Sequence, residues 1–219
     1  MSYVRENTLR IFDQIHDAAE RVGRDPASIK LIAVTKTVAP ERIREAIQAG
    51  VRDIGENRLQ EALPKREQLR DLGLTWHFIG HLQTNKARKA VENFDWIQCL
   101  DRLELAAKLN QAAAKPLPVL VEVKLHDEPN KSGMVEADLP AFIEQLTNHP
   151  QLQLRGFMAV PPFFEDPEEV RPYFQKLRKL AERFALPELS MGMSHDFQVA
   201  IEEGATMVRI GTALFGDRA

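Results

Sequence analysis

Lys36 has the residue type and position for covalent chemistry, because it follows Thr35 at the end of the apolar run Leu31 to Val34. A lysine attacks an aldehyde only through its neutral amine, and burial or a nearby cation favours that form. A lysine at the end of a buried strand is therefore a candidate for Schiff-base formation. A solvated lysine at a strand end is the alternative, and position alone leaves both interpretations open.

Two short segments near the end of the sequence are candidates for binding a phosphate group. They read Gly192-Met193-Ser194 and Gly211-Thr212. Glycine lets the backbone N–H groups approach an anion closely, and the Ser and Thr hydroxyls can donate hydrogen bonds. Such pairs also occur in ordinary turns, so the prediction depends on both segments meeting at one place in the fold.

Other polar residues fit the same kind of site. Arg209 precedes Gly211 by two residues, and its donor-only guanidinium would leave a neighbouring pyridine nitrogen unprotonated. A salt-bridged strand arginine is the alternative. Glu56 and Asn57 could orient Lys36 or a ring hydroxyl, or they could cap the helix that follows.

His77 and His81 have the spacing of two zinc ligands on a helix, but Phe78-Ile79-Gly80 between them resembles a strand end. We therefore expect no metal site there. We interpret Cys99, the single cysteine, as a buried strand residue that cannot form an internal disulfide.

These residues need elements that bring them together, and the sequence predicts eight strands alternating with helices. An opening helix over 4–22 precedes them. The expected strands cover 31–34, 52–54, 76–79, 96–100, 119–123, 152–158, 188–191 and 207–210. The helices between them cover 40–50, 59–72, 85–92, 103–114, 139–147, 168–184 and 197–203.

Eight parallel strands close a (β/α)8 barrel, in which active sites lie at the C-terminal ends of the strands and phosphate is often held after strands seven and eight. All the candidate residues above except His77 and Cys99 are at or near such ends. An open doubly wound sheet is the alternative. The glycine-rich fingerprint that favours it is missing after the first strand, where the sequence reads Thr35-Lys36-Thr37.

Length and composition agree with one soluble domain over residues 1–219. The chain is 44% hydrophobic, which suffices for a core without disulfides or a metal. Its 29 Lys and Arg against 32 Asp and Glu form no basic block, so we expect no nucleic-acid surface. The start contains no apolar signal segment and no later run could span a membrane, which favours a cytoplasmic protein.

Six segments together closely resemble the YggS family, also called the pyridoxal phosphate homeostasis protein family. The resemblance covers nearly the whole chain in the right order. The segments are Ala33-Val34-Thr35-Lys36, Gly55-Glu56-Asn57, His77-Phe78-Ile79-Gly80-His81-Leu82-Gln83-Thr84-Asn85-Lys86, Lys131-Ser132-Gly133, Met191-Gly192-Met193-Ser194-His195-Asp196 and Val208-Arg209-Ile210-Gly211-Thr212-Ala213-Leu214-Phe215-Gly216.

The resemblance implies a barrel like the N-terminal domain of alanine racemase, with pyridoxal 5′-phosphate (PLP) held as a Schiff base on Lys36. It implies that Met193, Ser194, Gly211 and Thr212 form the phosphate site. It further implies that Arg209 faces the pyridine nitrogen and that Asn57 lies beside the ring. Arg58, where the family commonly has Tyr, and Thr35, where Ser is usual, depart from the pattern.

The family is described as a monomeric carrier or regulator in vitamin B6 and amino-acid homeostasis, with PLP-dependent enzymes as possible recipients and no settled catalytic activity. A weak amino-acid racemase is the first alternative, and a cofactor-free lysine aldolase the second. We expect no robust turnover, because neither tyrosine, Tyr3 or Tyr173, is predicted beside the ring and no C-terminal domain is expected.

Overall fold

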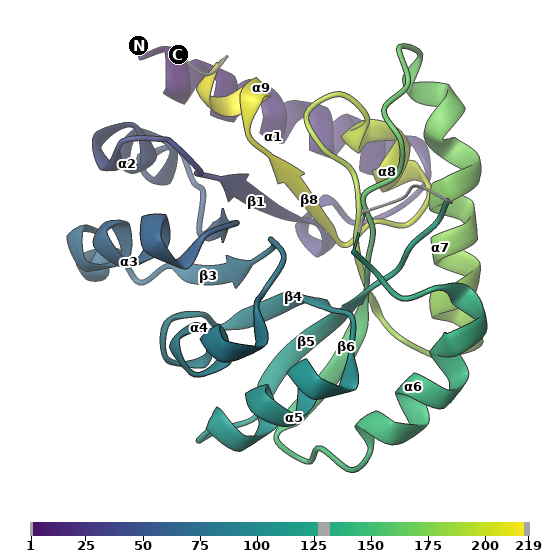
Figure 1. Cartoon of the computed structure of the whole chain (residues 1–219). Helices are drawn as coiled ribbons and strands as arrows, with labels where there is room; N and C mark the ends of the chain where they lie inside the picture. Colours follow the sequence, from purple (N-terminus) through teal and green to yellow (C-terminus); the bar gives the residue numbers. More distant parts are fainter. Residues whose placement is uncertain (1, 127–131, 217–219) are drawn as a thin grey trace.

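Eight parallel strands form a closed barrel in the computed structural model, which describes residues 2–126 and 132–216 (Figure 1). Each strand pairs with the next in chain order, and β8 pairs with β1. The barrel prediction is thus confirmed, and the open-sheet alternative is wrong. The strands are β1 (Lys30–Val34), β2 (Asp53–Glu56), β3 (Thr75–Phe78), β4 (Trp96–Leu100), β5 (Leu117–Glu122), β6 (Leu152–Met158), β7 (Glu188–Ser190) and β8 (Met207–Ile210).

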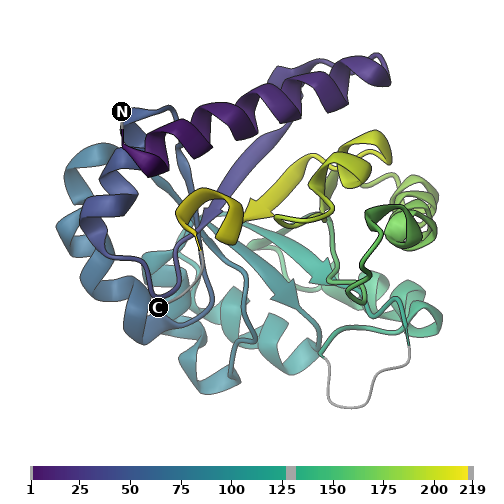
Figure 2. The same ribbon diagram turned by 90° about the horizontal axis from the view of Figure 1, so that it is seen from above.

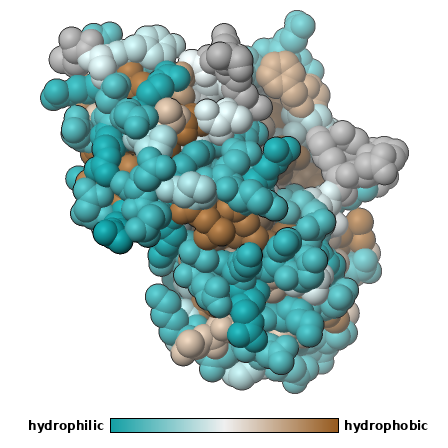
Figure 3. Space-filling model, turned by 60° about the vertical axis from the view of Figure 1, so that its left-hand side comes forward, coloured by the Kyte–Doolittle hydropathy of each residue, from teal (hydrophilic) through white to brown (hydrophobic). Residues whose placement is uncertain are grey.

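Helices surround the barrel on its outside (Figure 2). Their buried residues are mostly apolar, and the surface on the side of α2 to α4 is largely hydrophilic, with an apolar area near its middle (Figure 3). The helices are α1 (Tyr3–Arg21), α2 (Pro40–Gln48), α3 (Leu59–Gln68), α4 (Ala87–Asn93), α5 (Leu103–Ala112), α6 (Leu139–Leu146), α7 (Arg171–Arg183), α8 (Phe197–Glu202) and α9 (Thr212–Phe215).

Helix α1 covers the outside of the barrel next to β1 and β8, and it contacts α2, α8 and α9 (Figures 1 and 2). The Ser2 side chain caps the helix by accepting from the Arg5 N–H. Ile11, Ile15 and Ala18 lie on its buried face. Because β8 is followed only by the short helix α9 within the described residues, α1 supplies the helical cover that the last strand needs.

The structure differs from the sequence prediction by a few residues at many element boundaries. Strand β2 continues to Glu56, whereas the prediction ended it at Ile54. Gly55 lies inside this strand, and a side chain there would not fit because its Cβ would lie 2.8 Å from Ile32 Cγ2. The predicted helix over 168–184 begins as a 3₁₀ turn and becomes α7 only at Arg171, and α9 was not predicted. Among the described residues, no helix is long and apolar enough to cross a membrane.

Candidate functional site

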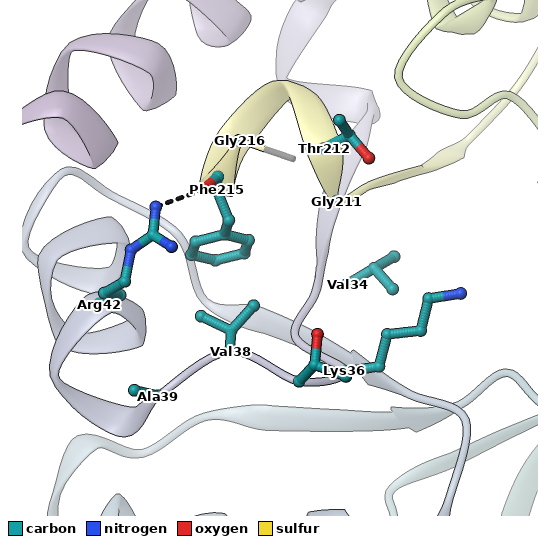
Figure 4. Close-up of a pocket in the computed structure, with 10 residues that line it drawn as sticks. Val34, Lys36, Val38, Ala39, Arg42, Gly211, Thr212, Phe215 and Gly216 are labelled. Carbon is teal, nitrogen blue, oxygen red and sulfur yellow. Dashed lines mark hydrogen bonds between the residues drawn. The ribbon is translucent and has the colours of Figure 1, made fainter. Parts of the chain in front are cut away.

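Lys36 lines a cavity of about 250 Å³ between the segment after β1 and helix α9. Its side chain is partly buried and extends past Val34, with the amine pointing away from Arg42 (Figure 4). The Arg42 guanidinium closes the other side by donating to the Phe215 carbonyl oxygen. The lining residues are Val34, Lys36, Thr37, Val38, Ala39, Arg42, Gly211, Thr212, Phe215 and Gly216. The structure therefore brings the candidate lysine together with Gly211 and Thr212.

A buried ion pair holds the backbone just before Lys36. Lys65 Nζ donates to Glu56 Oε1 at 2.8 Å and to the Thr35 carbonyl oxygen at 2.6 Å, and Thr35 Oγ1 donates to Glu56 Oε1 at 2.7 Å. Glu56 is fully buried, and a buried carboxylate is costly unless it is paired and hydrogen-bonded. Glu56 therefore orients the segment that carries Lys36.

The alternative role of Glu56 and Asn57 as helix caps is wrong, because α3 begins after Arg58 and has no side-chain cap within the described part of the chain. Lys65 was missed by the sequence analysis. The available signal was its position six residues after Leu59 and three after Ala62, on the buried face of a predicted helix.

The turn after Lys36 has strained backbone geometry. Thr37 has φ of 63°, in the left-handed region that β-branched residues rarely occupy. Its N–H donates to Glu61 Oε2 at 3.1 Å, which fixes this conformation. Such strain costs about 1–3 kcal/mol and tends to occur at ligand sites. It reverses the chain between Lys36 and α2.

The two predicted phosphate segments also meet in the structure. Ser194 Oγ accepts from the Ala213 N–H at 3.2 Å, which joins the loop after β7 to the first turn of α9. The first N–H groups of a helix have no acceptor within the helix. A Cβ on Gly211 would meet only Val34, at 3.5 Å or more, so the missing side chain leaves room in the cavity. The Met193 N–H donates to Asp196 Oδ1 at 2.6 Å and is therefore already engaged.

Arg209 lies inside the barrel and is 4% exposed. Its Nη1 donates to Ser190 Oγ at 2.7 Å and its Nη2 to the Ala159 carbonyl oxygen at 2.8 Å. Burial lowers the pKa of the Arg209 guanidinium to about 10, so the group is still a cation at neutral pH. It can supply positive charge to a ring beside it without giving up a proton.

Asn57 offers a buried acceptor near the same strand ends. Its Oδ1 is inaccessible to solvent and has no hydrogen-bond partner among the described residues. The Asn57 backbone is held by close packing on Gly80, where a Cβ would lie 2.4 Å from the Asn57 carbonyl oxygen. A buried acceptor without a partner is costly, so this atom suits a hydroxyl donor brought by a ligand.

The remaining candidates lie outside this constellation. His77 is buried inside the barrel, whereas the His81 side chain is 57% exposed, and the described residues contain no cluster of three metal-ligating side chains. Burial raises the pKa of the Cys99 thiol well above its usual value. The Arg58 side chain is 76% exposed and pairs with Glu61 at 3.5 Å. Lys131 lies outside the described residues.

Lys36, Gly211 and Thr212 line one cavity and Asn57 lines another, and the groups described above have the chemistry to bind an aromatic aldehyde that carries a phosphate and a ring nitrogen. Lys36 supplies the amine, and Ser194, Gly211 and Thr212 supply the surroundings that a phosphate needs. Arg209 supplies a buried cation, and Asn57 supplies an acceptor for a ring hydroxyl. The residues present therefore match PLP in each of its polar groups.

Comparisons with known proteins agree with this chemistry. A model of the alanine racemase N-terminal domain family matches residues 10–219. The chain is 47% identical to the pyridoxal phosphate homeostasis protein of Aquifex aeolicus, covering 97% of each chain. It is 43% identical to that of Escherichia coli K12, covering 100% of this chain and 98% of the other.

Solved structures give the same result. PipY of Synechococcus elongatus with PLP bound is 42% identical, with a TM-score of 0.81 over 93% of this chain and 100% of that one. Alanine racemase of Corynebacterium glutamicum, 20% identical, shares the fold with a TM-score of 0.73 over 99% of this chain and 60% of its own. By its sequence over almost its whole length and by its barrel, the chain belongs to the pyridoxal phosphate homeostasis protein family, within the alanine racemase N-terminal domain fold.

Proposed function

We propose that this chain binds PLP as a Schiff base on Lys36 and acts in vitamin B6 homeostasis as a carrier of the cofactor. The observation that supports this best is the cavity in which Lys36 meets Gly211 and Thr212. The lining of this cavity includes an amine together with a glycine and a threonine of the kind that surround a bound anion. Relatives named for PLP homeostasis and a PipY structure with PLP bound support the identity of the ligand.

Each residue has one role in the proposal. The Ser194 hydroxyl and the backbone at Gly211 and Thr212 bind the phosphate, Arg209 faces the ring nitrogen, and Asn57 Oδ1 accepts from the ring hydroxyl. When bound, the cofactor supplies a reactive aldehyde and a conjugated ring. The charge of Arg209 keeps the ring nitrogen unprotonated and therefore makes the ring a weak electron sink.

Lys36 forms and releases the covalent bond. Its neutral Nζ attacks the aldehyde carbon, a C=N bond forms, and the carbonyl oxygen leaves with two amine hydrogens as water. Addition of water reverses the step and frees the aldehyde. Reversible condensation without further chemistry is what a carrier requires, and the Glu56–Lys65 pair holds Lys36 at the end of β1.

Replacement of Lys36 tests the proposal. Lys36→Ala should abolish the visible absorbance of the PLP-loaded protein and leave its melting temperature without cofactor unchanged. Lys124→Ala is the matched control, because Lys124 also follows a strand but lines a different cavity, of about 210 Å³. Absorbance kept in Lys36→Ala, or a borohydride-reduced peptide containing Lys124 or Lys131, would refute the assignment.

Amino-acid turnover separates the carrier from a racemase. The PLP-loaded protein should not racemise L-alanine or L-serine at a rate near the common enzymatic range of about 1–10³ per second. Chromatography of the two enantiomers measures this. Sustained turnover that is lost in Lys36→Ala would refute the carrier function and show that the protein is a catalyst.

The proposal also includes a monomeric chain in the cytoplasm that hands PLP to PLP-dependent enzymes. In the part of the chain that the structure describes, the closed sheet leaves no strand edge to pair with another copy, which supports a monomer. Light scattering of the eluting protein tests the mass, cell fractionation tests the location, and transfer of PLP to a cofactor-free enzyme tests delivery.

A further inference from the structure

A chain of five polar side chains crosses the barrel interior behind Arg209, and we call it the Arg209 relay. Arg209 Nη1 donates to Ser190 Oγ at 2.7 Å, and Ser190 Oγ donates to Gln98 Oε1 at 2.6 Å. Gln98 Nε2 lies 3.0 Å from His77 Nδ1, and His77 Nε2 lies 2.8 Å from Asp53 Oδ1. Gln98 on β4 and Ser190 on β7 are not on neighbouring strands, so their bond spans the interior.

All donors in the relay point one way, from Arg209 to Asp53. A guanidinium can only donate, so Ser190 Oγ accepts from it and directs its own hydrogen at the Gln98 carbonyl oxygen. The Gln98 amide nitrogen must then donate to His77 Nδ1. His77 is thereby fixed as the neutral tautomer with hydrogen on Nε2, which donates to the carboxylate of Asp53.

Filling the barrel interior with these polar side chains costs more free energy than filling it with apolar ones. His77, Gln98 and Ser190 are fully buried, whereas the interior of such barrels is usually packed with branched apolar residues that need no partners. A buried polar group is costly unless every bond is made, and packed apolar residues often replace such groups without loss of stability. A role in holding Arg209 at its end therefore explains the relay better than a contribution to the stability of the fold does.

The Arg209 guanidinium is a buried cation whose hydrogen bonds go to neutral oxygens, while the carboxylates of Asp196 and Glu122 act on it through their charge. Arg209 bonds to the Ser190 hydroxyl and the Ala159 carbonyl, and the hydrogen-bonded carboxylate in the relay is Asp53, the first residue of β2. Two bonds on different guanidinium nitrogens fix the plane of the group. The bond to Gln98 directs the Ser190 hydrogen away from Arg209, so a lone pair of Ser190 Oγ faces the guanidinium.

We propose that Ser190, Gln98 and His77 are positioning residues that hold the Arg209 guanidinium toward the ring nitrogen of the bound cofactor, with Asp53 fixing the far end of the relay. This inference rests on the proposed binding of PLP. None of the three touches the ligand; each acts through Arg209. Breaking the relay at one member should therefore alter both its ends.

The first test uses the protein without cofactor and histidine labelled with ¹⁵N. The wild-type signal of His77, identified by its loss in His77→Asn, should report hydrogen on Nε2 and none on Nδ1. Ser190→Ala removes the donor to Gln98 Oε1. The Gln98 amide can then flip by 180°, and His77 should become a mixture of tautomers. Thr8→Val is the matched control, since Thr8 Oγ1 is a fully buried hydroxyl that donates to the Val4 carbonyl away from the barrel interior.

The second test measures the bound cofactor. Ser190→Ala and Gln98→Met, the latter of similar volume, should each shift the absorbance of bound PLP and its dependence on pH, and each should weaken binding. Ser190→Ala removes a hydrogen bond to the charged Arg209, so its Kd should rise by about tenfold. Thr8→Val should change neither quantity.

An unchanged His77 tautomer in Ser190→Ala overturns the inference, as does an unchanged absorbance in both relay variants or equal changes in Thr8→Val. If the wild type fails to bind PLP, the proposed function fails instead. The tautomer measurement then still decides whether Ser190 is coupled to His77.

Discussion

Gly211 and Gly192 should respond to alanine in opposite ways, because one glycine is needed by the ligand and the other by the fold. In Gly211→Ala the new methyl meets only Val34, at 3.5 Å or more, and the glycine has an ordinary negative φ of −116°. The protein without cofactor should therefore keep its melting temperature within about 2 °C, since contacts of this kind cost little.

The magnitude of the binding loss follows from the phosphate contacts. A methyl in the cavity moves a charged oxygen off its hydrogen bond, which costs about 1.5–3 kcal/mol, or roughly 10- to 150-fold in Kd. At 100 times the wild-type Kd, PLP stabilises the wild type by about 2.7 kcal/mol. A tenfold weaker variant gains about 1.4 kcal/mol at the same concentration, so its thermal shift should fall to about half.

Gly192→Ala provides the contrast. Gly192 has φ of 90°, and a Cβ there would lie 2.5 Å from Ala200 Cβ and 3.0 Å from Phe197 Cα. Strain and overpacking together cost roughly 2 kcal/mol or more, which lowers the melting temperature by at least about 4–8 °C in a chain of this size. Thermal unfolding and absorbance titration of both variants give the result. Unchanged PLP affinity in Gly211→Ala would refute the phosphate position.

Two further variants test the same site and its surroundings. Ser194→Ala should weaken PLP binding by roughly tenfold or more, because one donor to a charged oxygen is lost, while visible absorbance still develops at high cofactor concentration; an unchanged Kd in an absorbance titration would exclude this hydroxyl. Burial raises the pKa of the Glu122 carboxyl, so its ionisation opposes folding once the pH exceeds the ordinary carboxyl range of about 4. Glu122→Gln should therefore raise the melting temperature at pH 8 and leave it unchanged near pH 3, and an equal effect at both values would show that the charge is not responsible.

Much of the fold could be predicted because it depends on local patterns. Short apolar runs alternating with amphipathic segments require parallel strands joined by helices, and eight of them close a barrel. The strands β4, β6 and β8 have the predicted bounds. Lys36 could be located because a polar residue directly after a buried strand lies at the end of the barrel where sites form. The predictions of barrel and family are confirmed, and the roles of the site residues stay predictions.

The direction of each strand side chain was decided only by the tertiary structure. Parallel strands are buried on both faces, so their sequences do not alternate and cannot show which residues face inward. Gln98 and Ser190 therefore give no sign in the sequence that they bond across the interior. His77 was weighed only as a metal ligand, because its partners Asp53 and Gln98 come from the strands on either side of it.

Lys65 illustrates the same limit outside the barrel wall. The sequence shows a lysine on the buried face of a helix, but its partners are Glu56 and the Thr35 carbonyl, which come from two different strand ends. A charged group in such a place is stable only when those partners meet it, and barrel closure brings them together. The sequence by itself therefore determined the elements and the candidate lysine, whereas the arrangement that holds Lys36 and Arg209 in place depends on contacts between strands that only the closed barrel creates.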